Sequence, residues 1–276
     1  HFHERNANGD LVGGPMYYIK NGLKKHWHWL AYLFSAFGVL TVFGTGNATQ
    51  VNTITTAIDS ALYNYDIISK ESASTFNLII GIVLAALIAL ILLGGIKRIG
   101  QVTEKLVPFM AVMYILLALG VVIINFKAIP SVFGAIIEGA FNPSAVTGGA
   151  VGSFFMSMKK GVSRGIFSNE AGLGTGSIAH ACADTKKPVK QGFFGIFEVF
   201  VDTIVICTLT ALVILCSGVS VGYGEAAGAE LTISGFTSTY GGWVSIFTAV
   251  AMCCFAFSTI IGSVSYTHLR AHETVL

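Results

Sequence analysis

The amino-acid sequence predicts an all-α protein that crosses a lipid bilayer several times, and its composition is the first observation behind this prediction. Hydrophobic residues make up 54% of the 276 residues, whereas Asp, Glu, Lys and Arg together make up 11%. An ordinary soluble domain carries about 25% charged residues. So few charged side chains cannot cover a water-facing surface, which excludes a soluble cytosolic enzyme.

The second observation is a series of long apolar stretches, since a membrane-spanning helix needs about 20 apolar residues. Five stretches meet this length: Trp29–Ala48, Phe76–Gly95, Val107–Phe126, Phe193–Cys216 and Trp243–Gly262. A sixth stretch, Val132–Met158, is long enough but carries Asn142-Pro143 and Gly148-Gly149 near its centre. These residues disfavour a continuous helix. We therefore expect about six spans, one of which is a broken helix.

The distribution of basic residues is the third observation, because cytoplasmic loops carry an excess of Lys and Arg. If Val132–Met158 crosses the bilayer, all of the 16 Lys and Arg residues except Lys70 and Lys127 fall on one side. If it does not cross, the later loops change sides and the bias disappears. We therefore predict a multi-pass protein of the cytoplasmic (inner) membrane, with the start of this chain on the cytoplasmic side.

The broken stretch predicts a binding site near the middle of the membrane. Backbone polar groups in lipid must be paired, so an unwound segment survives only inside the protein or beside water. Its half-helix ends attract a carboxylate at an N-terminus and a cation at a C-terminus. Gly148 and Gly149 are therefore candidates for substrate contacts. The alternative is a re-entrant loop, or close helix packing through small residues such as Gly134 and Gly139.

Polar side chains within the apolar stretches are further candidates. Residues 44–53 are too polar to face lipid, and among them we choose Gln50 as a ligand contact. A hydrogen bond from Gln50 to a neighbouring helix is the alternative. Ser258 and Thr259 are adjacent hydroxyls that could bind a hard cation such as Na⁺. They could equally donate to a backbone carbonyl one turn earlier in their helix.

Two carboxylates, Glu198 and Asp202, lie four residues apart within an apolar stretch, on one face of the expected helix. Carboxylates inside a membrane are costly and usually mark an ion path or an ion pair. A proton path through both residues is one interpretation. An interfacial ion pair with the nearby cytoplasmic lysines is the other.

A glycine-rich segment, residues 165–181, follows the broken stretch. Its glycine spacing is similar to that of a dinucleotide-binding loop, but no strand or βαβ unit precedes it. We expect Asn169, Glu170 and His180 to tie this segment to the cytoplasmic face, with Asn169 and Glu170 as gate residues. A nucleophile pair of His180 with Ser177 has no other support in the sequence. The five cysteines show no CxxC spacing, so we expect neither a disulfide nor a metal site.

Three motifs together resemble the alanine or glycine:cation symporter (sodium:alanine symporter) family, in continuous order over about residues 1–262. The motifs are Gly13-Gly14-Pro15-Met16-Tyr17-Tyr18-Ile19, Phe43-Gly44-Thr45-Gly46-Asn47 and Gly165 to Ala181. The resemblance implies a leucine-transporter-type fold with a ten-helix inverted-repeat core, in which the first and sixth helices are unwound at the substrate. The spans of this chain look like helices three to eight, and Val132–Met158 falls on the sixth.

The resemblance also implies site residues. Gln50 and Thr259 match substrate-pocket positions, beside Gly148 and Gly149 in the unwound helix. Ser258 and Thr259 stand where this type of fold places a sodium-binding hydroxyl, so Thr259 could serve either role.

Two departures from the family bear on the limits of this region. The family typically continues after Gly262 with an aromatic stretch, and a pocket tryptophan would stand where this chain has Ser263. We therefore expect residues 1–262 to form the transporter core and residues 263–276 to be a frame-shifted or non-native tail. The first unwound helix would lie upstream of His1, so we expect this chain by itself to be inactive.

From the resemblance we expect a secondary transporter that takes up a small neutral amino acid, alanine or glycine, with Na⁺ by alternating access. Its partners would be this amino acid, Na⁺ and the lipid bilayer, without nucleic acid, enzymatic activity or a cofactor. One alternative is H⁺-coupled amino-acid transport through Glu198 and Asp202. The other is a membrane protein that couples no solute.

Overall fold

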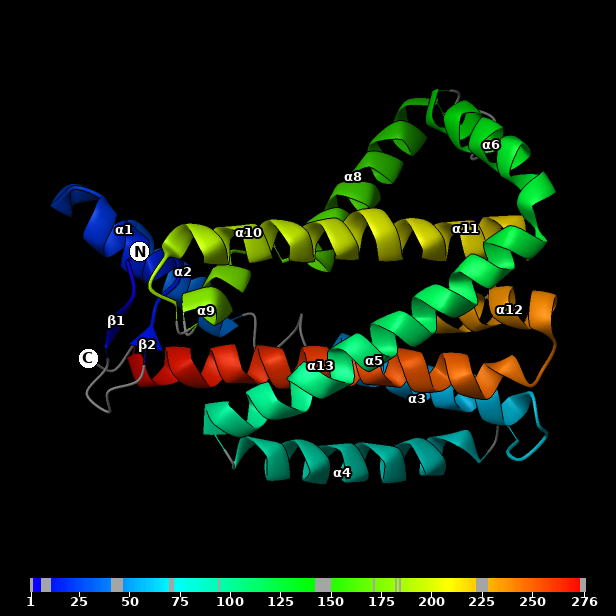
Figure 1. Ribbon diagram of the computed structural model, residues 1–276, viewed down its shortest axis with the longest axis horizontal. Coiled ribbons are helices and arrows are strands. Elements are labelled where there is room, and N and C mark those ends of the chain that lie inside the picture. Colours follow the sequence, from blue (N-terminus) through cyan, green and yellow to red (C-terminus); the bar gives the residue numbers. More distant parts are fainter. Residues whose placement is uncertain are drawn as a thin grey trace. The chain divides into compact units, whose positions relative to one another are not determined.

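The computed structural model describes residues 2–5, 11–40, 47–69, 72–93, 95–141, 150–170, 172–181, 183, 185–221 and 228–273. Almost all of them lie in helices (Figure 1), so the predicted all-α class is confirmed. The chain divides into two compact units. Unit 1 comprises His1–Thr41, Phe133–Thr208 and Tyr266–Leu276, and unit 2 comprises Val42–Val132 and Leu209–Ser265.

Four helical stretches in the described part of the chain are long and apolar enough to cross a membrane. They are α4 (Ala73–Leu92), most of α5 (Gly95–Ile124), the run Pro188–Cys216, and the first 20 residues of α13 (Val244–Glu273). The run Pro188–Cys216 consists of α10 (Pro188–Val199), a π-helix η4 (Phe200–Cys207) and α11 (Thr208–Cys216). These stretches correspond to four of the predicted spans, which supports a multi-pass membrane protein.

The first predicted span, Trp29–Ala48, contains helix α2 (Trp29–Leu40) and the beginning of helix α3 (Asn47–Tyr63), while residues 41–46 lie outside the described residues. The polar residues 47–53 form the first turns of α3. Helix α3 buries Ile54, Ala57 and Ala61 against its neighbours.

The predicted break in Val132–Met158 is flanked by two helices, α6 (Ile129–Phe141) and α8 (Ala150–Ser168). Asn142-Pro143 and Gly148-Gly149 lie outside the described residues. The broken helix, the count of six spans and the inverted repeat therefore stay predictions.

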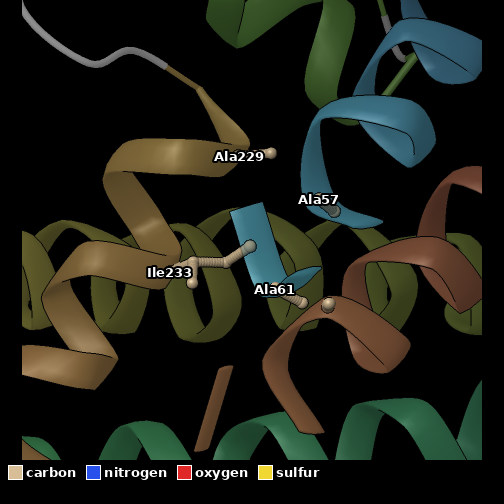
Figure 2. Close-up of a cluster of buried hydrophobic side chains, with 5 residues drawn as sticks. Ala57, Ala61, Ala229 and Ile233 are labelled. Atoms are coloured by element: carbon tan, nitrogen blue, oxygen red, sulfur yellow. The ribbon is translucent and has the colours of Figure 1, made fainter. Parts of the chain in front are cut away.

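Unit 2 packs α3, α4, α5, α12 (Ala229–Tyr240) and α13 around small side chains. Figure 2 shows Ala57 and Ala61 of α3 facing Ala229 and Ile233 of α12, and Ala249 of α13 completes this buried cluster. Small residues let helix backbones approach closely, which is how helices associate where lipid removes the hydrophobic driving force.

Aromatic rings also pack in the interior of unit 2. Tyr114 of α5 packs edge-on against Phe236 of α12 and Phe255 of α13, with ring centroids 5.7 and 5.6 Å apart. Its hydroxyl lies 2.5 Å from the Thr210 hydroxyl of α11, so the polar end of the ring is hydrogen-bonded. The short 3₁₀ helix η3 (Phe126–Ala128) follows α5.

Unit 1 holds the N-terminal part of the chain. Its strands β1 (Glu4–Arg5) and β2 (Leu11–Val12) form an antiparallel pair. They precede α1 (Pro15–Gly22), the 3₁₀ helix η1 (Lys25–Trp27) and α2, which packs on α1. The short helix α9 (Gly176–Ala181) contacts both β2 and α10, and α8 contacts η4.

Candidate functional site

Unit 1 contains a cavity of about 470 Å³ between α9, one face of α10 along its whole length and the N-terminal residues. This volume lies within the range of about 300–1,000 Å³ typical of small-molecule sites. Its polar and titratable lining side chains are His3, Tyr18, Asn169, Glu170, Ser177, His180, Thr185, Gln191 and Glu198. Two of the predicted gate residues and one of the predicted intramembrane carboxylates therefore line one cavity.

Two of the motifs that carry the family resemblance pack directly against each other beside this cavity. A Cβ at Gly13 would lie 2.6 Å from the Cβ of Ala181, and a Cβ at Gly14 would lie 2.5 Å from Cγ1 of Ile178. Gly14 also has φ +124°, a conformation that other residues rarely adopt. The Gly13-Gly14 pair is thus required for α9 to approach the N-terminal segment, a contact that the sequence analysis did not foresee.

The end of α8 is hydrogen-bonded to the π-helix. Ser168 Oγ donates to Asp202 Oδ2 at 2.7 Å, and Asn169 Nδ2 donates to Thr203 Oγ1 at 3.1 Å. Thr203 Oγ1 itself lies 3.4 Å from Asp202 Oδ2. The predicted residues Asn169 and Asp202 therefore belong to one network, and π-helical turns occur often at functional sites. Ser168, Thr203 and Cys207, whose thiol lies 3.4 Å from Ser168 Oγ, also belong to it. Only the position of Ser168 and Thr203 next to predicted residues could have indicated these two.

Glu170 stabilises the glycine-rich segment itself. Its Oε2 accepts a hydrogen bond from Thr175 Oγ1 at 2.6 Å, and its backbone carbonyl accepts from the N–H groups of Leu173 and Gly174. Its φ is +55°, in the left-handed region. Glu170 therefore closes the turn that links α8 to α9.

Glu198 and Asp202 have different partners, although their spacing predicts a common face. Glu198 Oε2 lies 3.1 Å from His180 Nε2, whereas Asp202 bonds to Ser168 of α8. The π-helix begins at Phe200, between the two carboxylates, and its wider turn changes the angular spacing of an α-helix. The ion-pair partner of Glu198 is His180 rather than one of the lysines.

Helices α3 and α13 of unit 2 run antiparallel and hold the other predicted site residues. At one end, Ser263 Oγ donates to Asn47 Oδ1 at 2.6 Å. Further along, the Cys253 thiol lies 3.9 Å from the carbonyl oxygen of Ile54. Later residues of α3 therefore meet earlier residues of α13.

Gln50 and Thr259 lie at the same level of this helix pair. By helical spacing, Gln50 shares a face of α3 with Asn47 and Ile54, both of which contact α13. Thr259 falls between Ala256 and Ser263, two residues that also pack on α3. Both Gln50 and Thr259 are half-buried. The helix register thus brings two predicted substrate contacts to one level, while Gly148 and Gly149 lie outside the described residues.

The two predicted cation ligands donate to the same backbone oxygen. Ser258 Oγ and Thr259 Oγ1 each lie 2.9 Å from the carbonyl oxygen of Phe255, which is the alternative considered from the sequence. Ser258 Oγ also lies 4.0 Å from Met110 Sδ, so the Ser258 side chain is directed toward α5. A hydroxyl that donates one hydrogen bond keeps oxygen lone pairs that can bind a cation.

Comparisons with known proteins agree with the motifs. A family profile described as "Sodium:alanine symporter family" matches residues 1–272. The "Sodium/alanine symporter AgcS" of Methanococcus maripaludis is 40% identical over 264 residues, which are 92% of this chain and 54% of the relative. The "Amino-acid carrier protein AlsT" of Bacillus subtilis is 40% identical over 260 residues, 93% of this chain and 51% of the relative.

A third relative, an "Uncharacterized transporter" of Haemophilus influenzae, is 41% identical over 264 residues, 94% of this chain and 54% of the relative. The chain thus spans about half the length of the curated relatives it matches. The profile covers nearly the whole chain and describes transporters rather than enzymes, which confirms the resemblance found in the three motifs. This chain belongs to the sodium:alanine symporter family.

Proposed function

We propose that the protein takes up a small neutral amino acid, alanine or glycine, together with Na⁺ by alternating access across the cytoplasmic membrane. Family membership supports the reaction class, and the names of two relatives, a sodium/alanine symporter and an amino-acid carrier, agree with it. The observation that carries the site is the antiparallel register of α3 and α13, with Gln50 and Thr259 at one level.

In this proposal the amino acid binds between Gln50, Thr259 and the segment that contains Gly148 and Gly149. The amide of Gln50 can donate to the substrate carboxylate or accept from its ammonium. The Thr259 hydroxyl, which donates to the Phe255 carbonyl, can accept from the ammonium. Exposed half-helix ends would supply the remaining complementary dipoles. Na⁺ would bind hydroxyl oxygens at Thr259 and Ser258, since hard cations prefer oxygen ligands.

Substitution of Gln50 tests the substrate site. In proteoliposomes made with the full-length gene product, Gln50→Ala should raise the KM for alanine about tenfold, since one lost hydrogen bond to a charged group is worth roughly 1.5 kcal/mol. The matched control is Gln101→Ala, at an exposed position of α5, which should leave the KM unchanged. Equal KM values for the Gln50 variant and the control would refute the assignment of Gln50.

Asp202 supports H⁺ coupling as a second candidate function. This carboxylate lies near the middle of the apolar run Pro188–Cys216 and accepts a hydrogen bond from Ser168. If it carries the coupling proton, Asp202→Asn should abolish uptake driven by a pH gradient and leave exchange of alanine across the membrane intact. Asp66→Asn, at an exposed turn, is the control. Uptake by Asp202→Asn that still follows the pH gradient would exclude Asp202 as the carrier of the coupling proton.

A further inference from the structure

His180 lies on a continuous stripe of α10 that presents three different groups to its ring. Gln191, Gly195 and Glu198 are spaced so that they share one face of this helix. His180 Nε2 lies 3.1 Å from Glu198 Oε2, and His180 Nδ1 lies 2.6 Å from the side-chain nitrogen of Gln191. A Cβ at Gly195 would lie 3.4 Å from Nε2, so this glycine leaves room for the ring. The imidazole is therefore held at both nitrogens.

Both protonation states of His180 can keep these two contacts. In the neutral ring, Nδ1 accepts from the Gln191 amide and Nε2–H donates to Glu198. In the imidazolium both nitrogens donate, so the Gln191 amide must turn to present its oxygen. Only the imidazolium forms a charge-assisted bond with the carboxylate, which is stronger than the neutral one. Protonation therefore strengthens the link between α9 and α10.

The residues around His180 indicate that this side chain makes the contact between α9 and α10 depend on pH. Its hydrogen bond with Glu198 raises its pKa above the ordinary value of 6.5, while partial burial acts in the opposite direction. Among the described residues, the other titratable side chains that line the same cavity are His3, Tyr18 and Glu170. Strand β2, which also packs on α9, consists of Leu11 and Val12 and therefore adds no titratable side chain near His180. Glu170 is already bonded to Thr175, so Glu198 is the carboxylate that pairs with His180.

We propose that His180 is a positioning residue for the gate. When the imidazole of His180 is protonated, it holds α9, and with it the glycine-rich segment, more tightly against α10. This inference rests on the proposed role of the segment as a gate in a transporter. Acidification then keeps the wall of the 470 Å³ cavity in place, and a rise in pH releases it. Because the His180 side chain is 29% exposed and that of Glu198 is 65% exposed, water screens the pair and its effect is modest.

The first test is a titration of His180 by NMR of the ¹⁵N-histidine-labelled protein in micelles, with His180→Gln used to assign its signal. Glu198→Gln should lower the pKa of His180, because it removes the carboxylate charge and keeps the side-chain size. Glu104→Gln, an exposed carboxylate of α5, is the matched control and should leave the titration unchanged. Identical titrations of His180 in the wild type and in Glu198→Gln would overturn the proposal.

The second test measures hydrogen exchange of the backbone amides of residues 176–181, corrected for the intrinsic effect of pH. In the wild type, protection should fall about two- to fivefold between about pH 5.5 and about pH 8.5, the range that a partly exposed ion pair allows. His180→Gln keeps hydrogen-bonding capacity and loses the titration, so its protection should not change with pH. A pH-dependent fall that persists in His180→Gln would exclude His180 as its origin.

These measurements separate the inference from the proposed function. Both report on α9 and His180 without any transported solute, so they can succeed in a protein that shows no alanine uptake. Such an outcome would refute the transport proposal and leave the pH-dependent contact standing. Normal alanine uptake together with pH-independent hydrogen exchange of residues 176–181 would support the transport proposal and refute the pH-dependent contact.

Discussion

At the scale of single residues, neighbouring hydroxyls on one helix have different surroundings. Thr259 lies on the side of α13 that packs against α3, whereas Ser258 lies near Met110 of α5. Their donation to the Phe255 carbonyl is common for Ser and Thr in apolar helices, and it leaves oxygen lone pairs for a cation. We therefore expect Thr259, rather than Ser258, to serve both substrate and Na⁺.

Removal of the Thr259 hydroxyl tests this difference. Thr259→Val, which keeps the shape of the side chain, should raise the Na⁺ concentration for half-maximal alanine uptake about tenfold, equivalent to roughly 1.4 kcal/mol. Thr103→Val is a matched control, because Thr103 also donates to a backbone carbonyl within its own helix, α5. A larger effect from Ser258→Ala than from Thr259→Val would contradict the assignment.

At the scale of elements, α9 and the N-terminal segment are joined through positions that have no room for a side chain. The close approach at Gly13 requires its neighbour Ala181 to be small as well. This packing fixes α9, which in turn presents His180 to α10. The position of the cavity wall therefore depends on two short motifs far apart in the sequence.

The substitution Gly13→Ala should therefore destabilise unit 1. The added methyl group would lie 2.6 Å from the Cβ of Ala181, and such overpacking typically costs about 1–3 kcal/mol. Gly100→Ala in α5 is the control, since a Cβ there meets nothing within 4 Å. Protein stability in detergent, followed by thermal unfolding, should fall for Gly13→Ala alone. Equal melting temperatures for the two variants would show that the interface can adjust without cost.

The elements show where sequence reasoning succeeded and where it ended. Apolar length alone located the four stretches that, among the described residues, are long and apolar enough to cross a membrane, because that requirement is local. Apolar length did not reveal helix α3, which runs from Asn47 to Tyr63, since its first two turns are rich in polar residues. The different partners of Glu198 and Asp202 were also hidden, because a π-helix has no readable sequence pattern.

The sequence proposes residues for the candidate site, which stay predictions, but it does not give their contacts. Gln50, Thr259 and Asp202 were proposed because polar groups in apolar surroundings need partners, and Asn169 because it lies in the glycine-rich segment. The sequence does not say which partner each one finds. That choice depends on the register of α3 against α13, and on the meeting of α8 with the π-helix. Both are set by tertiary packing.

At the scale of the whole molecule, the direction in which the chain crosses the membrane depends on one stretch. The loop that contains Lys127 and the loop that contains Lys187 lie on opposite sides only if Val132–Met158 crosses. Alkaline phosphatase fused after Lys127 should be active, and fused after Lys187 it should be inactive, because the enzyme folds only outside the cytoplasm. Fusions after Lys20 and Lys70 serve as the inactive and active references. Activity at both Lys127 and Lys187 would refute the sixth span.

The close contact between Gly13 and Ala181 has a consequence for how the family can vary. The two positions share a space that holds one methyl group, so the methyl group can belong to either partner. Ala181→Gly should act as a suppressor of Gly13→Ala, although the two residues are far apart in the chain. Natural relatives that have alanine at the position of Gly13 should accordingly have glycine at the position of Ala181.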